Sequence, residues 1–230
     1  MRARRGGCGR RWPPVNERQG DERQRDERQG DEHYFTADPS VPFRRVPVRA
    51  EVWGQELRLT SGSGVFAQGR LDVGTAVLFR ETEPPASSPG RRYLDLGCGY
   101  GVVALALATV LPDADVRAVD VNERAVLLTR ENATALGLQA RVRASTPDAV
   151  PAGERYDEIW SNPPIRVGKQ ALHELLLRWL PRLEPTGRAV LVVGKNLGAD
   201  SLQRWLDDQG FATTRLASSK GFRVLEVRPG

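Results

Sequence analysis

Three segments of the chain carry residue types and spacings that could bind a small molecule and act on it, and the first is a glycine-rich turn. Residues 95–101, Asp-Leu-Gly-Cys-Gly-Tyr-Gly, follow a short apolar stretch and precede a longer one. Glycines at alternate positions let the backbone approach a ligand closely, and the helix expected next offers free amide N–H groups. The NAD fingerprint would place its third glycine at Val102, so the GxGxG spacing disfavours a dinucleotide. The alternative is a tight turn that binds nothing.

The second segment ends in the carboxylate of Asp120, nineteen residues after Gly101. A carboxylate at the end of the second strand of such a unit faces the ligand crevice and can accept hydrogen bonds from both hydroxyls of a ribose. The alternative role is that of an N-cap for the helix that begins at Glu123, which Asn122 already fills well. The glycine turn and the acid together therefore indicate a nucleoside ligand.

The third segment, Ser-Asn-Pro-Pro-Ile at 161–165, is the most specific. Two consecutive prolines fix their φ angles and remove two backbone donors, so the loop presents carbonyl oxygens and the amide of Asn162. Such a site can accept both hydrogens of a planar NH2 group and orient its nitrogen toward an electrophile. The alternative is a rigid turn at the end of a strand.

The elements around these segments alternate between strands and helices. This order predicts a mostly parallel seven-stranded sheet covered on both faces, with its last two strands paired as an antiparallel hairpin at one edge. Ligands of such sheets bind at the carboxyl ends of the strands, where all three segments fall. The expected strands are 93–96, 116–121, 141–144, 159–161, 189–193, 213–217 and 222–227, and the expected helices are 102–111, 123–136, 169–180 and 199–209.

The N-terminal part of the chain differs from this α/β pattern. Residues 43–59 alternate apolar and polar side chains, which predicts two short strands followed by a turn at 61–64. We expect a small β-containing cap lobe at 33–80, a linker loop at 81–92 and the main domain at 93–230. Residues 17–32 repeat a five-residue unit without apolar side chains, so 1–32 are predicted to be a disordered tail. Its arginines suggest either an RNA-touching arm or a solvated extension.

Composition limits the class of protein. There are 34 Lys and Arg against 29 Asp and Glu, a formal net charge of +5, and no run of 18 apolar residues that would span a membrane. The basic N-terminus lacks the apolar core of a secretory signal. Cys8 and Cys98 form neither a disulfide framework nor a cysteine-based zinc site. The sequence predicts a cytoplasmic protein without a structural metal.

Together the three segments resemble the class I S-adenosylmethionine-dependent methyltransferases, and Asn-Pro-Pro at 162–164 is typical of the branch that methylates amino nitrogens. More closely, Ser-Gly-Val-Phe at 63–66, Asp-Val-Gly-Thr at 72–75 and residues 162–169 resemble the small-domain methyltransferases related to the 16S ribosomal RNA guanine-N2 methyltransferases. The resemblance covers 33–227 and implies a Rossmann-like fold.

The resemblance also implies roles for individual residues. Gly97 and Gly99 would lie under the methionine part of S-adenosylmethionine, Asp95 near its amino group and Asp120 at its ribose. Asn162 and the carbonyl of Pro163 would accept the hydrogens of the target amine. The implied cofactor contacts are Asp95, Gly97, Cys98, Gly99, Gly101, Asp120, Val121, Thr146 and Asn162; the implied catalytic loop is Asn162, Pro163, Pro164 and Ile165; the implied substrate contacts are Phe66, Arg166 and Lys169.

Two positions depart from the family pattern. The acidic residue that contacts adenine in the family aligns with Thr146, with Asp148 two residues further on. An aromatic residue that often stacks on the target base is replaced by Ile165, and such stacking is worth about 1–3 kcal/mol. Phe66 is the candidate to replace it.

The expected reaction is methyl transfer from S-adenosylmethionine to an exocyclic amino nitrogen of a nucleobase in RNA, with guanine N2 of ribosomal RNA, free or in a ribosomal subunit, as the leading candidate. A second hypothesis replaces the base by a protein glutamine amide or a small-molecule amine. A third is a non-catalytic RNA-binding assembly protein with the same fold. The paired acceptors of the Asn-Pro-Pro loop argue against the third, because binding alone does not need them.

Overall fold

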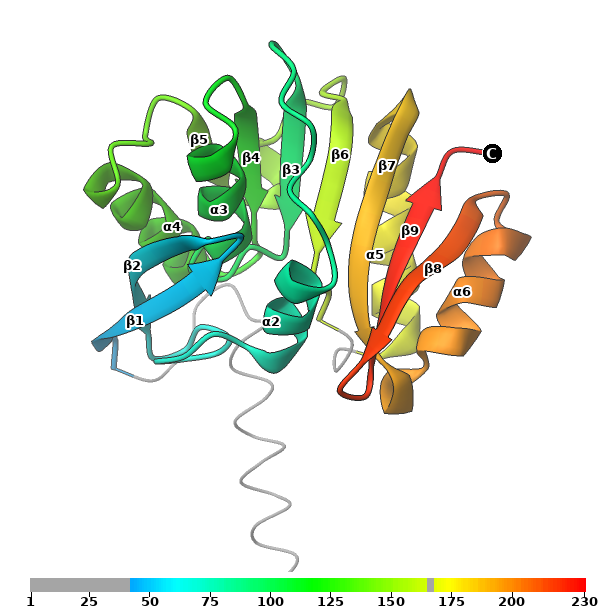
Figure 1. Cartoon of the computed structure of the whole chain (residues 1–230), viewed down its shortest axis with the longest axis horizontal. Coiled ribbons are helices and arrows are strands. Elements are labelled where there is room, and N and C mark those ends of the chain that lie inside the picture. The colour runs from blue at the N-terminus through cyan, green and yellow to red at the C-terminus, as the bar shows by residue number, and fades with distance from the viewer. Residues whose placement is uncertain (1–41, 165–167) are drawn as a thin grey trace, which may run out of the picture.

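A seven-stranded sheet forms the centre of the protein in a computed structural model that describes residues 42–164 and 168–230. The strand order is β5-β4-β3-β6-β7-β9-β8; β9 runs antiparallel to both of its neighbours, β7 and β8, and all other adjacent strands are parallel (Figure 1). The strands are β3 (Arg92–Leu96), β4 (Asp115–Val119), β5 (Val142–Ser145), β6 (Tyr156–Ser161), β7 (Leu183–Gly194), β8 (Ala212–Ser219) and β9 (Phe222–Arg228). The predicted fold class and its C-terminal hairpin are confirmed.

Helices cover both faces of this sheet (Figure 1). One face packs on α2 (Val73–Arg80), α3 (Val102–Val110) and α4 (Glu123–Ala135), and the other on α5 (Lys169–Trp179) and α6 (Ala199–Asp208). Successive residues of a strand point to opposite faces, so Trp160 joins the first layer and its neighbour Ile159 the second. No helix of the described residues is long and apolar enough to cross a membrane.

The N-terminal segment forms a separate two-stranded antiparallel sheet, β1 (Arg45–Val52) and β2 (Gln55–Gly62). The alternating pattern predicted these two strands, although β2 continues through the first half of the turn expected at 61–64. Its buried side chains, such as Val48 and Leu59, belong to the same core cluster as α3 and α4. The boundaries of a cap lobe and linker remain a prediction, and the predicted disordered tail at 1–32 lies outside the described residues.

Helix α2 was not expected from the sequence. Asp72 caps its N-terminus, where its carboxylate accepts a hydrogen bond from the backbone N–H of Thr75 at 3.1 Å. Val77, Leu78 and Phe79 are buried, and the helix packs against β7 and β9 of the main sheet. Its eight residues are too few for a clear helical period, which explains the omission.

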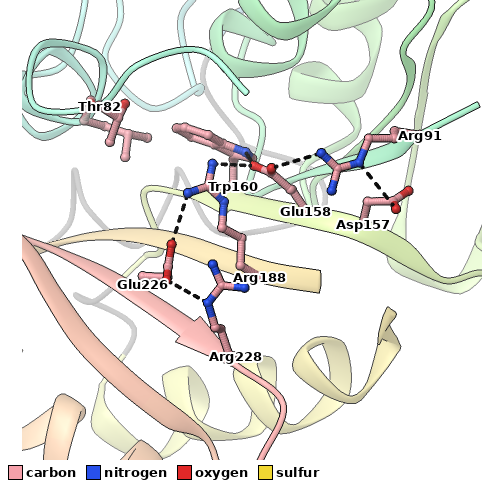
Figure 2. A network of polar contacts seen from close by, with 9 residues as sticks. Thr82, Arg91, Asp157, Glu158, Trp160, Arg188, Glu226 and Arg228 are labelled. Atoms are coloured by element: carbon pink, nitrogen blue, oxygen red, sulfur yellow. Dashed lines mark hydrogen bonds and ion pairs between the residues drawn. The ribbon is translucent and has the colours of Figure 1, made fainter. Parts of the chain in front are cut away.

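A buried polar network fixes the middle of the sheet (Figure 2). Glu158 of β6 is 3% exposed, accepts a 2.9 Å hydrogen bond from Trp160 Nε1 and lies 3.2 Å from Arg188 Nη2. Arg188 also donates to Glu226 of β9 at 3.0 Å, so the network ties β6, β7 and β9 together. A buried carboxylate that is paired with a guanidinium on the neighbouring strand holds these strands in one register.

Replacing Glu158 with alanine is expected to lower the free energy of unfolding by about 3 kcal/mol, because the Trp160 N–H and the Arg188 guanidinium lose a partner in the interior. Urea denaturation followed by tryptophan fluorescence measures the change. Glu56→Ala is the matched control, because Glu56 contacts Arg58 on the exposed face of the hairpin and should leave the urea midpoint near that of the parent protein. Equal midpoints for both variants would contradict a stabilising role for the network.

Candidate active site

The three predicted segments meet in one pocket of about 210 Å³ at the carboxyl ends of β3, β4 and β6. These three strands are adjacent in the sheet, with β3 between β4 and β6, so the loops after them converge. The pocket lining takes Gly97 from the first loop, Asp120 from the second and 162–164 from the third. The structure therefore brings residues of all three predicted segments to one pocket.

The glycine turn adopts a backbone that side chains rarely allow. Gly97, Gly99 and Gly101 have φ angles of 77°, 56° and 88°, all in the left-handed region. A Cβ added to Gly99 would meet no atom within 4 Å, so this side of the turn is open to a ligand. A Cβ on Gly101 would instead approach Thr129 of α4 to 2.7 Å, so Gly101 serves the packing of α3 against α4.

Asp120 is held beside this turn by two backbone donors. Its Oδ2 accepts a hydrogen bond from Gly99 N at 2.9 Å, and its Oδ1 accepts one from Asn122 N at 2.9 Å. Removal from water raises the pKa of the Asp120 carboxyl, and the backbone N–H groups of Asn122, Gly99 and Val121 partly offset that rise. Each oxygen keeps a further lone pair, so the carboxylate can accept hydrogen bonds from two neighbouring hydroxyls.

Asp95 lies deeper, at a smaller adjoining pocket of about 30 Å³ that also includes Gly97 and Gly99. Its Oδ2 accepts a hydrogen bond from Ala104 N at 2.9 Å, which anchors it to α3. Burial raises the pKa of Asp95 to about 7, and the negative charge of Asp120 adds to the rise. A cationic group bound here would favour the ionised form.

Asn162 reaches across the pocket wall to α2. Its Nδ2 donates to Asp72 Oδ2 at 2.7 Å and to Thr75 Oγ1 at 3.0 Å. Both hydrogens of the amide are therefore used within the protein, and the carbonyl oxygen Oδ1 is the atom left to accept a hydrogen bond from a ligand. Pro163 and Pro164 follow in the same wall and can contribute backbone carbonyls but no N–H donors.

Residues 56–226 match the methyltransferase small domain family, which is more than half of the chain. The chain belongs to this family. Among curated relatives it is 32% identical over 199 residues to the uncharacterized protein YbxB of Bacillus subtilis, covering 85% of this chain and 98% of that protein. It is 37% identical over 176 residues to ribosomal RNA small subunit methyltransferase C of Chromohalobacter salexigens, covering 74% of this chain.

A solved structure of the same kind is similar over most of the chain. The Thermus thermophilus 16S rRNA N2 G1207 methyltransferase RsmC, in complex with AdoMet and guanosine, superposes with a TM-score of 0.70 at 25% identity. The match covers 84% of this chain and 52% of that one. This methyltransferase small-domain chain thus spans about half the length of that enzyme and of the curated methyltransferase C relative.

Several pocket residues of this family member were missed by sequence reasoning. Leu175 of α5, Gly194 at the end of β7 and Phe222 at the start of β9 also line the pocket, as do Asp72, Val65, Ala125 and Pro147. Gly194 and Phe222 are partners in the β7–β9 register, so only the insertion of β9 beside β7 brings them to the site. Phe66, predicted as a substrate contact, lines both pockets and is 38% exposed.

Other predicted contacts lie elsewhere or are not described. Among the described residues, Gly101, Thr146 and Lys169 are outside the lining of both pockets, although Pro147 beside Thr146 is part of it. Asp148 points to Arg178 at 2.9 Å and is exposed. Cys98 borders only the smaller pocket and contacts the Thr129 hydroxyl. Ile165 and Arg166 fall within 165–167, outside the described residues.

Proposed function

We propose that this protein transfers a methyl group from S-adenosylmethionine to an exocyclic amino nitrogen of a nucleobase in RNA, with guanine N2 of ribosomal RNA as the acceptor. The observation that carries the proposal is that Asn162 and Pro163 line the same pocket as Gly97 and Asp120. A paired acceptor for an NH2 group therefore borders a pocket suited to a nucleoside. The similar Thermus thermophilus enzyme is in complex with AdoMet, which is S-adenosylmethionine, and guanosine. This supports both the proposed cofactor and the proposed base.

The residues present fit S-adenosylmethionine. Asp120 would accept hydrogen bonds from the ribose hydroxyls, and the open side of Gly99 would face the methionine part. Asp95 would pair with the ammonium group, which suits a buried carboxyl at the base of the smaller pocket. Val119, Val121 and Pro147 offer apolar walls for the adenine, in place of the acidic residue that the family usually has.

Bound S-adenosylmethionine supplies a methyl carbon on positively charged sulfur, so positioning and the exclusion of water are the work left to the protein. Asn162 Oδ1 and the carbonyl of Pro163 would accept the two hydrogens of the target amine, which would turn the nitrogen lone pair toward the methyl carbon. As the new N–C bond forms, the bond between methyl and sulfur would break, and the methylated nitrogen would release one of its two hydrogens as a proton to water. Phe66 and Phe222 line the same pocket and offer aromatic surface to a flat base. A base in a stacked RNA must first leave its stack, at a cost of a few kcal/mol.

A substrate panel tests the proposal. Purified protein is incubated with methyl-labelled S-adenosylmethionine and, separately, with protein-free ribosomal RNA, small and large ribosomal subunits, ribosomal protein and simple amines. We expect label in RNA, released on digestion as N2-methylguanosine, from at least one RNA substrate. Label in protein or in a small amine would replace the proposed substrate, and no transfer to any of them together with unmeasurable cofactor affinity would indicate a non-catalytic binding protein.

The affinity for S-adenosylmethionine is expected to fall as the pH drops through 7. The pKa of Asp95 is about 7 in the free protein, so at lower pH the carboxyl is protonated and cannot pair with an ammonium group. Calorimetry should give a Kd about tenfold weaker at pH 6 than at pH 8. Asp95→Asn is the control. The cofactor and Asp120 are present in both experiments, so their titration cancels when the Kd of the parent protein is divided by the Kd of Asp95→Asn at each pH. An identical pH profile for Asp95→Asn would contradict this pairing.

A further inference from the structure

We infer that the first turn of α2 is a socket that fixes the amide of Asn162 with its oxygen available to the target amine, so that Asp72 and Thr75 are positioning residues for methyl transfer. The inference rests on the proposed function, since it assigns a purpose to the orientation of Asn162. The socket consists of Asp72, Gly74 and Thr75. Asp72 and Thr75 accept hydrogen bonds from the Asn162 side chain, and Gly74 leaves room for it.

Two acceptors in the socket engage the same nitrogen. Asp72 Oδ2 lies 2.7 Å and Thr75 Oγ1 3.0 Å from Asn162 Nδ2, across 90 and 87 positions of sequence. Thr75 is 5% exposed, so water competes little for its hydroxyl. Asp72 Oδ2 also accepts a hydrogen bond from Thr75 N at 3.1 Å, which fixes the carboxylate to the first turn of α2. The socket is therefore rigid before any ligand binds.

These contacts select one of the two faces that an amide can present. An asparagine amide can rotate by half a turn and exchange its oxygen and nitrogen. The rotated form would place Oδ1 against the Asp72 carboxylate, which accepts hydrogen bonds but has none to donate. It would also offer an N–H donor to a target amine whose own hydrogens need acceptors. The socket thus holds the productive orientation, and its negative charge polarises the amide so that Oδ1 becomes a stronger acceptor.

Gly74 supplies the space for this arrangement. A Cβ at this position would lie 3.0 Å from Asp72 Oδ2, 3.0 Å from Phe222 Cε1 and 3.2 Å from Asn162 Nδ2. All three distances are tighter than ordinary contacts, so any side chain would press on the carboxylate, the aromatic wall and the amide together. The glycine is required by close approach, since its φ angle is not in the left-handed region.

Four variants separate positioning from helix capping. Asp72→Ser keeps a good N-cap but is too short to reach Asn162, whereas Asp72→Asn keeps both a cap and an acceptor oxygen. Thr75→Val removes the second acceptor at nearly constant volume. Thr82→Val is its matched control, because the Thr82 hydroxyl donates to Leu78 O at the other end of α2 and does not contact Asn162.

We expect kcat to fall about 30-fold in Asp72→Ser and about tenfold in Thr75→Val, but less than about threefold in Asp72→Asn. Thr82→Val should keep the parent kcat. The Kd for S-adenosylmethionine should stay within about twofold in all four, because the socket acts on the amide rather than on the cofactor. This division between kcat and cofactor Kd would not arise from a general loss of stability.

A second readout does not depend on activity. The chain has five asparagines, so a spectrum of 15N-asparagine-labelled protein contains five side-chain NH2 pairs, and Asn162→Ala assigns the one of interest. Its hydrogens should exchange slowly with water in the parent protein and in Thr82→Val, and faster in Asp72→Ser and Thr75→Val. Parent-like exchange and kcat in both socket variants would overturn the inference, as would an equal loss of kcat in Thr82→Val. Normal turnover by Asn162→Ala would refute the role given to Asn162 and with it the socket, whereas the absence of methyl transfer to any RNA by the parent protein would refute the proposed function.

Discussion

We expect Asn162→Ala to lower kcat by about two to three orders of magnitude and to change the Kd for S-adenosylmethionine less than threefold. The alanine removes the side-chain acceptor that orients the target amine, and the glycine turn and Asp120 remain in place. Single-turnover kinetics with ribosomal RNA and calorimetry with the cofactor measure the two quantities separately. The effect is expected to be the largest of any single substitution in the pocket.

Asn196→Ala is the matched control for that experiment. Asn196 is exposed in the short helix Lys195–Leu197 and does not line either pocket, so the same chemical change should leave kcat intact. Thermal unfolding of both variants checks that the lost contacts of Asn162 with Asp72 and Thr75 have not unfolded the site. A folded Asn162→Ala protein that turns over at the parent rate would disprove the role given to this residue.

Asp120→Ala is expected to weaken the binding of S-adenosylmethionine about 100-fold. Two hydrogen bonds from ribose hydroxyls to a charged carboxylate are worth about 1.5–3 kcal/mol each, part of which water recovers in the variant. The loss also frees Gly99 N, which Asp120 Oδ2 holds at 2.9 Å, so the glycine turn becomes less ordered. Calorimetry measures the Kd directly.

Asp113→Ala provides the comparison, since Asp113 is an exposed aspartate in the turn after α3. It should bind the cofactor as the parent protein does. Saturating S-adenosylmethionine should restore much of the turnover of Asp120→Ala, because the acceptor loop at Asn162 is untouched. A Kd for Asp120→Ala within twofold of the parent value would contradict the ribose contact.

The parts of the site that follow parallel strands could be predicted from the sequence. Gly97, Asp120 and Asn162 each come directly after a short apolar strand, and the carboxyl ends of parallel strands meet at one edge of the sheet. Their convergence follows from topology, without knowledge of side-chain packing. For the same reason the helices that alternate with these strands were found close to their observed bounds.

The contacts that depend on tertiary packing could not be predicted. Asp72 and Asn162 are 90 positions apart, and nothing local to either shows that α2 docks against β7 and β9. Phe222 reaches the pocket only because β9 inserts between β7 and β8. Likewise β7 starts six residues before the predicted 189, because Leu183 pairs with Tyr156 ahead of a register shift between the two strands. The sequence Glu-Pro-Thr-Gly that follows Leu183 is typical of a turn, so this first part of the strand was not predicted.

The central claim is that this pocket methylates an amino group of RNA, and the most direct measurement is a quantitative comparison of nucleosides by mass spectrometry. Ribosomal RNA is taken from cells that lack the protein and from the same cells supplied with the parent protein or with Asn162→Ala. We predict that N2-methylguanosine falls in the deficient cells, returns with the parent protein and does not return with Asn162→Ala. An unchanged nucleoside profile in the deficient cells, or full recovery with Asn162→Ala, would contradict the account.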